Sequence, residues 1–132
     1  KIEGKNMSTI KLSIVTPTGE IFNDDVKSLT LPGKEGEFGV LEGHASLVSS
    51  LTVGVIVIEK TDSSTEAIAI NWGYVNVSES AVDVLVDGAV SLNPSDSSTT
   101  AANIETAKEL VNSVQDSNVS MAAVNAKISS FA

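Results

Sequence analysis

The stretch LPGKEGEFGVLEGHASL, residues 31–47, is the most distinctive part of the sequence, and the rest of the chain is arranged around it. It holds four glycines within a short span, namely Gly33, Gly36, Gly39 and Gly43. Glycine permits a positive φ, and it lets a neighbouring group approach where a Cβ would block it. Pro32 fixes φ and lacks an N–H donor, so we expect the strand before it to end there. The pattern predicts a loop of defined shape.

Apolar and acidic side chains lie between these glycines. We expect Phe38, Val40 and Leu41 to hold the loop against a core, because they are its large apolar residues. The acidic residues of the loop are Glu35, Glu37 and Glu42. An acidic loop that is fixed in this way is suited to docking a partner more than to catalysis.

The composition argues against several classes of function. The chain has 132 residues and a formal net charge of −9, so nucleic acid and anionic lipid are poor partners. All eight Lys and Arg residues are lysine, which removes the guanidinium fork that binds phosphates. Without cysteine, neither a disulfide framework nor a thiolate metal site is available. No apolar run approaches the ~18 residues of a membrane span, and we expect residues 1–6, before Met7, to be an appended remnant.

Residues 7–92 read as a series of short strands. Alternating or continuous apolar runs occupy residues 10–15, 20–22, 26–31, 45–51, 53–59, 66–70, 72–77, 81–85 and 88–92. Turn-forming residues separate the runs, and no helical pattern lies between them. About nine or ten strands of this kind predict an antiparallel β-sandwich or a flattened barrel.

The composition changes at Asn93. Residues 93–100, NPSDSSTT, predict a linker because they are turn formers and small polar residues. Residues 101–132 carry apolar positions at spacings of three and four, broken near Asp116, which predicts an antiparallel hairpin of two helices. The expected packing positions are Ile104, Ala107, Val111 and Val114 on the first helix, and Met121, Val124, Ile128 and Phe131 on the second. Because such short helices are unstable alone, a mobile hairpin and a permanently packed one both stay open.

The residues give little support for catalysis or metal binding. His44 is the only histidine, and a backbone hydrogen bond that holds the loop explains it better than proton transfer. No metal site is predicted, and no serine lies in a G-x-S-x-G motif. Glu35 and Glu37 could form a glycosidase-like pair, but few aromatic residues are available to stack sugars. Trp72 and Tyr74 share one strand face, where packing explains them better than a ligand platform.

A family resemblance rests on the run P-G-x-E-G-E-x-G-V-x-x-G-H-A at residues 32–45, with NWGYVNV at 71–77 and VDVLVDGAV at 82–90. This sequence resembles the epsilon subunit of bacterial F-type ATP synthase, homologous to the mitochondrial delta subunit. The resemblance implies a ten-stranded β-sandwich followed by a two-helix hairpin. It also implies a non-catalytic rotor subunit without cofactors, which links the gamma subunit to the c ring on the cytoplasmic face of the bacterial inner membrane.

The resemblance also implies a role for the glycine-rich stretch. In the family, the loop matching residues 34–39 faces the polar loops of the c ring, and Glu37 occupies the position most associated with that contact. We therefore expect Glu35 and Glu37 to meet polar or basic groups of the ring. The full set of expected c-ring interface residues is Lys34, Glu35, Glu37, Phe38, Val40 and His44. The alternative is that these acids are only solvated loop carboxylates.

The tail departs from the [I/L]-D-x-x-R-A motif by which many bacterial family members bind ATP. The matching residues are Ile104, Glu105, Lys108 and Glu109. Lysine in place of arginine loses the bidentate phosphate contact and Glu109 adds repulsion, so we expect little or no ATP binding. Family hairpins also inhibit ATP hydrolysis by inserting basic side chains among acidic segments of the beta subunits. With only Lys108 and Lys127 in this tail, such inhibition is expected to be weak.

Two other classes of function stay open. A free-standing β-sandwich binding module predicts a concave aromatic or polar site. A small hydrolase predicts that replacing His44 abolishes activity.

Overall fold

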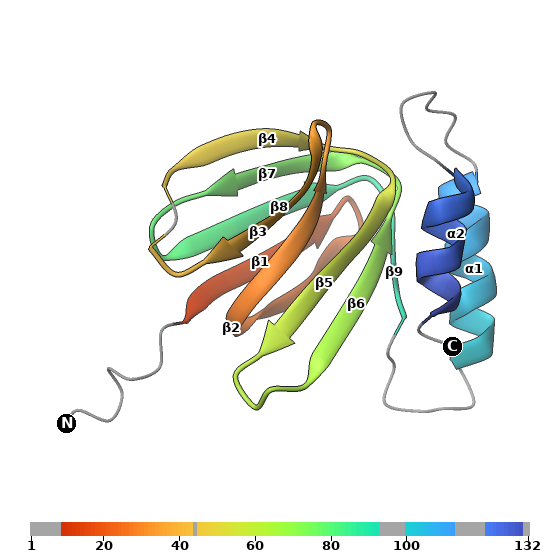
Figure 1. Cartoon of the computed structure of the whole chain (residues 1–132), viewed down its shortest axis with the longest axis horizontal. Helices are drawn as coiled ribbons and strands as arrows, with labels where there is room; N and C mark the ends of the chain where they lie inside the picture. Colours follow the sequence, from red (N-terminus) through yellow and green to blue (C-terminus); the bar gives the residue numbers. More distant parts are fainter. Residues whose placement is uncertain (1–8, 44, 93–99, 113–120, 131–132) are drawn as a thin grey trace.

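The computed structural model describes residues 9–43, 45–92, 100–112 and 121–130. Nine strands come first in these residues, and two helices follow (Figure 1). The strands are β1 (Ile10–Thr16), β2 (Gly19–Gly33), β3 (Gly36–Leu41), β4 (Leu47–Leu51), β5 (Gly54–Lys60), β6 (Thr65–Ile70), β7 (Gly73–Val77), β8 (Ala81–Val86) and β9 (Ala89–Ser91). The predicted β-sandwich followed by helices is confirmed, with nine strands in the described residues rather than the ten that the resemblance implies.

The strands form two layers that are joined at both edges, because β2 pairs with β4 as well as with β1. One layer has the order β1-β8-β7-β4, the other has the order β2-β5-β6-β9, and β3 is added to β2. β1 also pairs with β2, which connects the layers into a flattened barrel. β1 and β8 run parallel, so the expectation of a wholly antiparallel sandwich is wrong for this pair. A parallel pair needs a long connection, and the six strands between β1 and β8 supply it.

β2 is the longest strand, with 15 residues. Two separate strands, at 20–22 and 26–31, are predicted from the sequence because Asn23, Asp24 and Asp25 are turn formers. This prediction is wrong, since all three residues are paired with β1. Their side chains are exposed, so the strand tolerates polar residues there, and burial begins at Val26.

Pro32 does not end β2, contrary to the prediction. Proline lacks an N–H donor, but its carbonyl oxygen still accepts the backbone N–H of Thr52 at 2.9 Å. Pro32 is also in register with Glu37 of β3. β2 therefore continues to Gly33.

Strands β5 and β6 are buried on both faces. Their isoleucines point into the main core between the two layers, and these are Ile56, Ile58, Ile68 and Ile70. The alternate positions belong to a second core on the outer face, which includes Val53, Val55, Ala67, Ala69 and Leu92. The small alanines of β6 leave room for a covering layer on that face.

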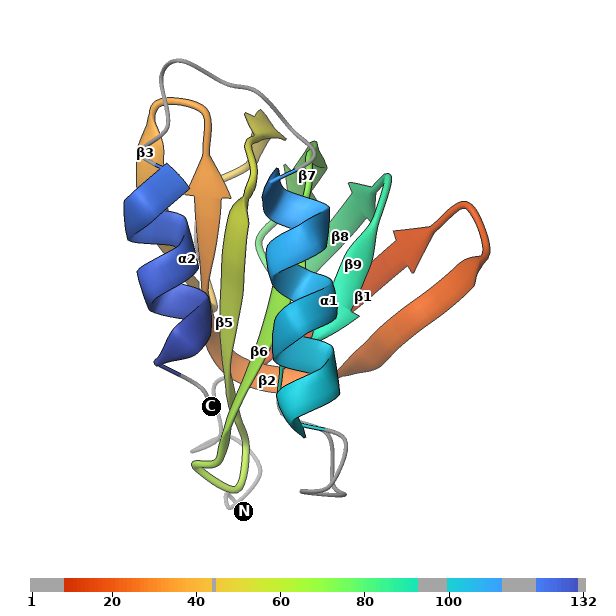
Figure 2. The ribbon, with the colours of Figure 1, turned by 90° about the vertical axis from the view of Figure 1, so that its right-hand side faces the viewer.

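Helices α1 (Thr100–Asn112) and α2 (Met121–Ser129) are this covering layer (Figure 2). Ala107 of α1 and Ile128 of α2 are fully buried in the second core, and Val124 packs against it. Nδ2 of Asn125 donates a hydrogen bond to Oδ1 of Asn112 at 3.0 Å, which ties the helices together. The hairpin is therefore docked on the sheet.

Several expectations fall outside the described residues. These concern residues 1–6, most of the linker at 93–100, Val114, Phe131, and the side chains of Ile104, Val111 and Met121. Of the two helices that are described, neither is long and apolar enough to cross a membrane.

Candidate functional site

The glycine-rich stretch forms a β-hairpin rather than the expected loop. β2 and β3 pair from Ser28 and Leu41 to Gly33 and Gly36, which leaves Lys34 and Glu35 as the turn. Gly36 has a φ of 126°, a value that residues with a Cβ rarely adopt. The stretch is therefore a paired projection, and we call residues 33–37 the β2–β3 tip.

Phe38 and Val40 hold this tip against the main core. A Cβ on Gly33 would come within 2.7 Å of Cε1 of Phe38, so glycine leaves space for the ring. Phe38 is half-buried beside the core, and Val40 is fully buried in it. The expectation for Leu41 is wrong, because alternation along β3 places it on the opposite, exposed face.

The end of β4 and the turn that follows it form hydrogen bonds with the backbone at the tip. The backbone N–H of Lys34 donates to the carbonyl oxygen of Ser50 at 3.1 Å. The hydroxyl of Thr52 lies 3.4 Å from the carbonyl oxygen of Pro32, in addition to the backbone hydrogen bond between these residues. The backbone of the tip is thus fixed to β4 and to the turn that follows it.

The charged side chains of the tip are exposed, but Glu37 has a partner in the helical hairpin formed by α1 and α2. Nζ of Lys127, on α2, donates to Oε2 of Glu37 at 2.5 Å. The Glu37 side chain remains 52% exposed and the Lys127 side chain 33% exposed. The ion pair is therefore open to solvent, and it joins the tip to a helix far along the chain. This contact could not be found from the sequence, because no spacing relates the two residues.

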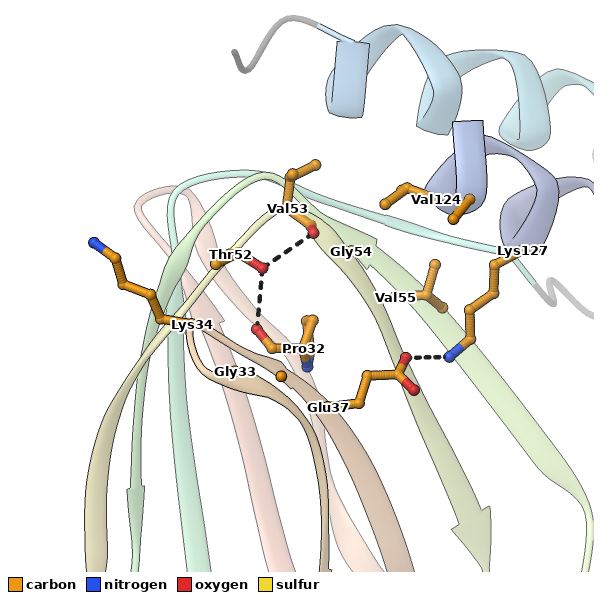
Figure 3. A pocket seen from close by; sticks show the side chains of 12 residues that line it. Pro32, Gly33, Lys34, Glu37, Thr52, Val53, Gly54, Val55, Val124 and Lys127 are labelled. Atoms are coloured by element: carbon orange, nitrogen blue, oxygen red, sulfur yellow. Dashed lines mark hydrogen bonds and ion pairs between the residues drawn. The ribbon is translucent and has the colours of Figure 1, made fainter. Parts of the chain in front are cut away.

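A groove of about 440 Å³ lies around this ion pair, between the tip and α2 (Figure 3). Its lining includes the apolar side chains of Val53, Val55 and Val124. Figure 3 shows Lys34 pointing away from Glu37 and Lys127, so the two lysines present their charges in different directions. The groove is partly apolar, and its charges lie on the sides formed by the tip and α2.

An exposed apolar surface begins beside the tip. The rings of Trp72 and Tyr74 meet edge to face, with centroids 6.3 Å apart. Leu85 of β8 is the cross-strand partner of Tyr74, and all three side chains are about half exposed. We call these three residues the aromatic face. A hollow of about 210 Å³ is lined by Lys34 together with Trp72 and Tyr74, so the tip and the aromatic face adjoin.

Asn71 is a buried polar residue whose role is missed by sequence reasoning. Its Oδ1 accepts the N–H groups of Trp72 and Gly88, each at 2.8 Å, and its Nδ2 donates to Asp87 at 3.0 Å. Asn71 thereby ties the β6–β7 turn to the β8–β9 turn and positions Trp72. An asparagine between two predicted strands suggests a turn, but it does not reveal the second turn that it binds.

The shifted pKa values lie far from this site, at the β5–β6 turn. The hydrogen bond and charge of Glu66 raise the pKa of Lys60, and the two groups are 3.1 Å apart. Hydrogen bonds from the hydroxyl and N–H of Ser64 lower the pKa of Asp62. In Figure 2 this turn lies at the opposite end of β5 from the tip. These shifts therefore belong to the turn and not to the site.

The other expected site residues lie on α1 or outside the described residues. Glu105 and Glu109 are exposed on α1, and Lys108 is half-buried. His44 and the side chain of Ile104 lie outside the described residues. In the part of the chain that the structure describes, no three His, Cys, Asp or Glu side chains are grouped so that they could hold a metal ion.

The β-sandwich belongs to a recognised class of domain. Residues 9–92 match the model of the family described as "ATP synthase, Delta/Epsilon chain, beta-sandwich domain". The chain is 75% identical over 126 residues to the ATP synthase epsilon chain of Aliarcobacter butzleri, which covers 96% of this chain and 100% of that one. It is 54% identical over 122 residues to the ATP synthase epsilon chain of a Nitratiruptor species, and this alignment covers 92% of this chain and 95% of that one. The chain therefore belongs to the ATP synthase epsilon chain family, whose members are non-catalytic subunits of the central stalk.

Solved structures agree with this assignment. A chain in the Euglena gracilis mitochondrial ATP synthase structure, which contains OSCP, F1 and the c ring, aligns with a TM-score of 0.62 at 25% identity. The alignment covers 92% of this chain and 74% of that one. A chain of the Tetrahymena thermophila mitochondrial central stalk and c ring shares the fold, with a TM-score of 0.56 at 13% identity and coverage of 79% and 94%. The expected epsilon-type subunit without catalytic activity is confirmed.

Proposed function

We propose that this chain joins the gamma subunit to the c ring, so that ion flow through the ring turns both together and drives ATP synthesis. The observation that supports this is the adjacency of the β2–β3 tip and the aromatic face on one sandwich. A part that transmits torque has to hold two partners in a fixed relative orientation. Two exposed surfaces of different chemistry, linked through β4, which pairs with both β2 and β7, meet that requirement.

The tip is the proposed contact with the c ring. Lys34, Glu35 and Glu37 are exposed at its end, while Phe38 and Val40 are the residues that keep it at a fixed height above the core. Charged groups at the rim of an interface mainly set orientation and association rate. We infer that Glu35 and Glu37 select polar or basic loops on the ring.

The aromatic face is the proposed contact with gamma. Trp72, Tyr74 and Leu85 keep about half of their surface exposed, although they are large and apolar. Contiguous exposed apolar side chains mark protein interfaces, and Trp and Tyr are enriched among the residues that dominate binding energy. A partner that covers this face would remove these side chains from water.

The hairpin has a secondary role in this proposal. We infer a division into a sandwich over residues 7–92 and a hairpin over residues 101–132, joined by a linker. The helical hairpin has only two lysines, Lys108 and Lys127, so its electrostatic attraction to acidic segments of the beta subunits is weak. In addition, Lys127 is already paired with Glu37. Inhibition of ATP hydrolysis should accordingly be weak. We further propose that the complex lies at the cytoplasmic face of the bacterial inner membrane.

The test of the ring contact is binding of the full chain to the purified c ring of the cognate enzyme. Glu37→Lys should weaken binding roughly tenfold or more, because it reverses the charge at the proposed contact. Glu42→Lys is the matched control, since Glu42 is exposed at the far end of β3. Unchanged binding by Glu37→Lys would exclude the tip as the ring contact.

The test of the gamma contact uses the same design on the aromatic face. Tyr74→Ser should weaken binding to gamma by about 2 kcal/mol, as expected for truncation of a buried aromatic anchor. Ile21→Ser removes an exposed apolar side chain from the β1–β2 hairpin and should have little effect. A free-standing binding module would bind neither gamma nor the ring, and that result would contradict the proposed function as a whole.

A further inference from the structure

We propose that α2 and the c ring compete for Glu37, so that occupation of the tip by the ring loosens the hairpin and docking of the hairpin weakens the ring contact. This inference rests on the proposed function, because it requires the tip to meet the ring. It starts from the ion pair between Oε2 of Glu37 and Nζ of Lys127. Glu37 is thus both an expected ring contact and a docking point for α2.

α2 is a short helix that is attached mainly by its buried side chains and by a hydrogen bond from Asn125 to α1. It has nine residues, too few to be stable as an isolated helix. Ile128 is fully buried in the second core and Val124 is half-buried there. Lys127 lies next to Ile128 and reaches across the groove to the tip (Figure 3). A change at Glu37 therefore acts on α2 directly, at the residue beside its buried anchor.

The competition follows from charge. A basic group of the ring that pairs with Glu37 would stand a few ångströms from the ammonium group of Lys127, and the two cations would repel each other. The groove of about 440 Å³ around the pair gives an incoming side chain room to approach. Because both Glu37 and Lys127 remain partly exposed, exchange of one cation for the other requires no opening of the core.

The size of the effect is set by the strength of the ion pair. Exposed pairs contribute at most about a factor of five to an equilibrium, and the coupling between two binding events is reciprocal. The ring should therefore loosen α2 by about two- to fivefold, and loss of Lys127 should strengthen ring binding by the same factor.

The test combines amide hydrogen exchange of α2 with c-ring binding, both on the full chain. Lys127→Gln should speed the exchange of α2 amides about two- to fivefold and should strengthen ring binding by a similar factor. Lys108→Gln removes the same charge from α1, where the described residues offer it no ion pair, and should change neither quantity. Adding the purified ring to the wild-type chain should raise α2 exchange toward the Lys127→Gln value, while adding it to Lys127→Gln should have no further effect.

The results separate this inference from the proposed function. If Glu37→Lys weakens ring binding as expected but Lys127→Gln binds the ring no better than Lys108→Gln, the ring contact stands and the competition is refuted. The competition is also refuted if adding the ring to the wild-type chain leaves the exchange rate of the α2 amides unchanged. If Glu37→Lys binds the ring normally, the proposed contact fails, and the competition fails with it.

Discussion

Gly54 of β5 lies against Pro32 of β2 with no space for a side chain between them. A Cβ on Gly54 would stand 2.6 Å from Cβ of Pro32, well inside van der Waals contact. The pyrrolidine ring cannot rotate away, because it is closed onto its own backbone. This contact lets β5 pass closely behind the β2–β3 tip.

Gly54→Ala should therefore destabilise the protein by about 1–3 kcal/mol, as overpacking does elsewhere. Urea unfolding followed by circular dichroism measures this change. Gly39→Ala is the matched control within β3, since the nearest atom to its added Cβ would be 3.9 Å away. Equal midpoints for Gly54→Ala and the wild-type chain would refute the packing argument.

Asn71→Ala should cost about 1–3 kcal/mol, because the N–H groups of Trp72 and Gly88 would lose their buried acceptor. Asn71→Asp keeps an acceptor oxygen but places a carboxylate beside Asp87. Its destabilisation should be larger at neutral pH than at acidic pH, where a proton relieves the repulsion. Unfolding by urea at neutral and at acidic pH measures both effects. A pH-independent loss in Asn71→Asp would show that repulsion with Asp87 is absent.

Ile128→Ala should release α2 without unfolding the sandwich. The substitution removes a fully buried side chain from the second core, and such truncations cost about 2–5 kcal/mol. Amide exchange should become much faster in α1 and α2, while amides of β1 and β8 keep their protection. Ser129→Ala, at an exposed neighbour, should leave both sets unchanged. Faster exchange throughout the sandwich would instead show that the hairpin and sheet unfold together.

The pKa of the Asp62 carboxyl should lie below its ordinary value of 3.8, because Ser64 hydrogen-bonds to the charged form. A lowered folded-state pKa means that this contribution to stability is fully present above pH 3.8 and is lost as the pH falls through the folded value. An NMR titration of the side-chain carboxyl measures this. Ser64→Ala should move the pKa back toward the ordinary value. An unchanged pKa in that variant would rule out Ser64 as the cause.

Calorimetry with Mg²⁺ and ATP should show no saturable binding to the full chain. Glu105 and Glu109 are exposed on α1 beside Lys108, and the chain has no arginine to take phosphate in a bidentate manner. GTP serves as the control for weak non-specific heats. Tight binding that favours ATP over GTP would contradict this prediction.

Most strands are predictable from the sequence because alternation and β-branched residues are local signals. The prediction fails in β2, where Asn23, Asp24 and Asp25 suggest a turn. An exposed strand that is rich in polar residues has the same composition as a turn, so the sequence does not distinguish the two. The pairing of these residues with β1 does. Pro32 misleads for a related reason, since its missing donor suggests a strand end while its retained acceptor continues the pairing.

The site is less predictable than the fold. The glycine-rich run locates the tip, and Phe38 and Val40 are recognisable as its apolar supports. The partnership of Glu37 with Lys127 and the two-turn role of Asn71 depend on how distant segments are placed. Periodicity carries no information about such placement, so these contacts required the structure.

The parallel pairing of β1 with β8 bears on how the chain assembles. During synthesis, β1 obtains its β2 partner at once, but its other edge stays unfilled until the segment that begins at Ala81 has left the ribosome. Contacts between such distant segments slow folding, because a long loop has to close before they form. A nascent chain that stops short of β8 therefore carries an open strand edge, the feature that invites pairing with other chains.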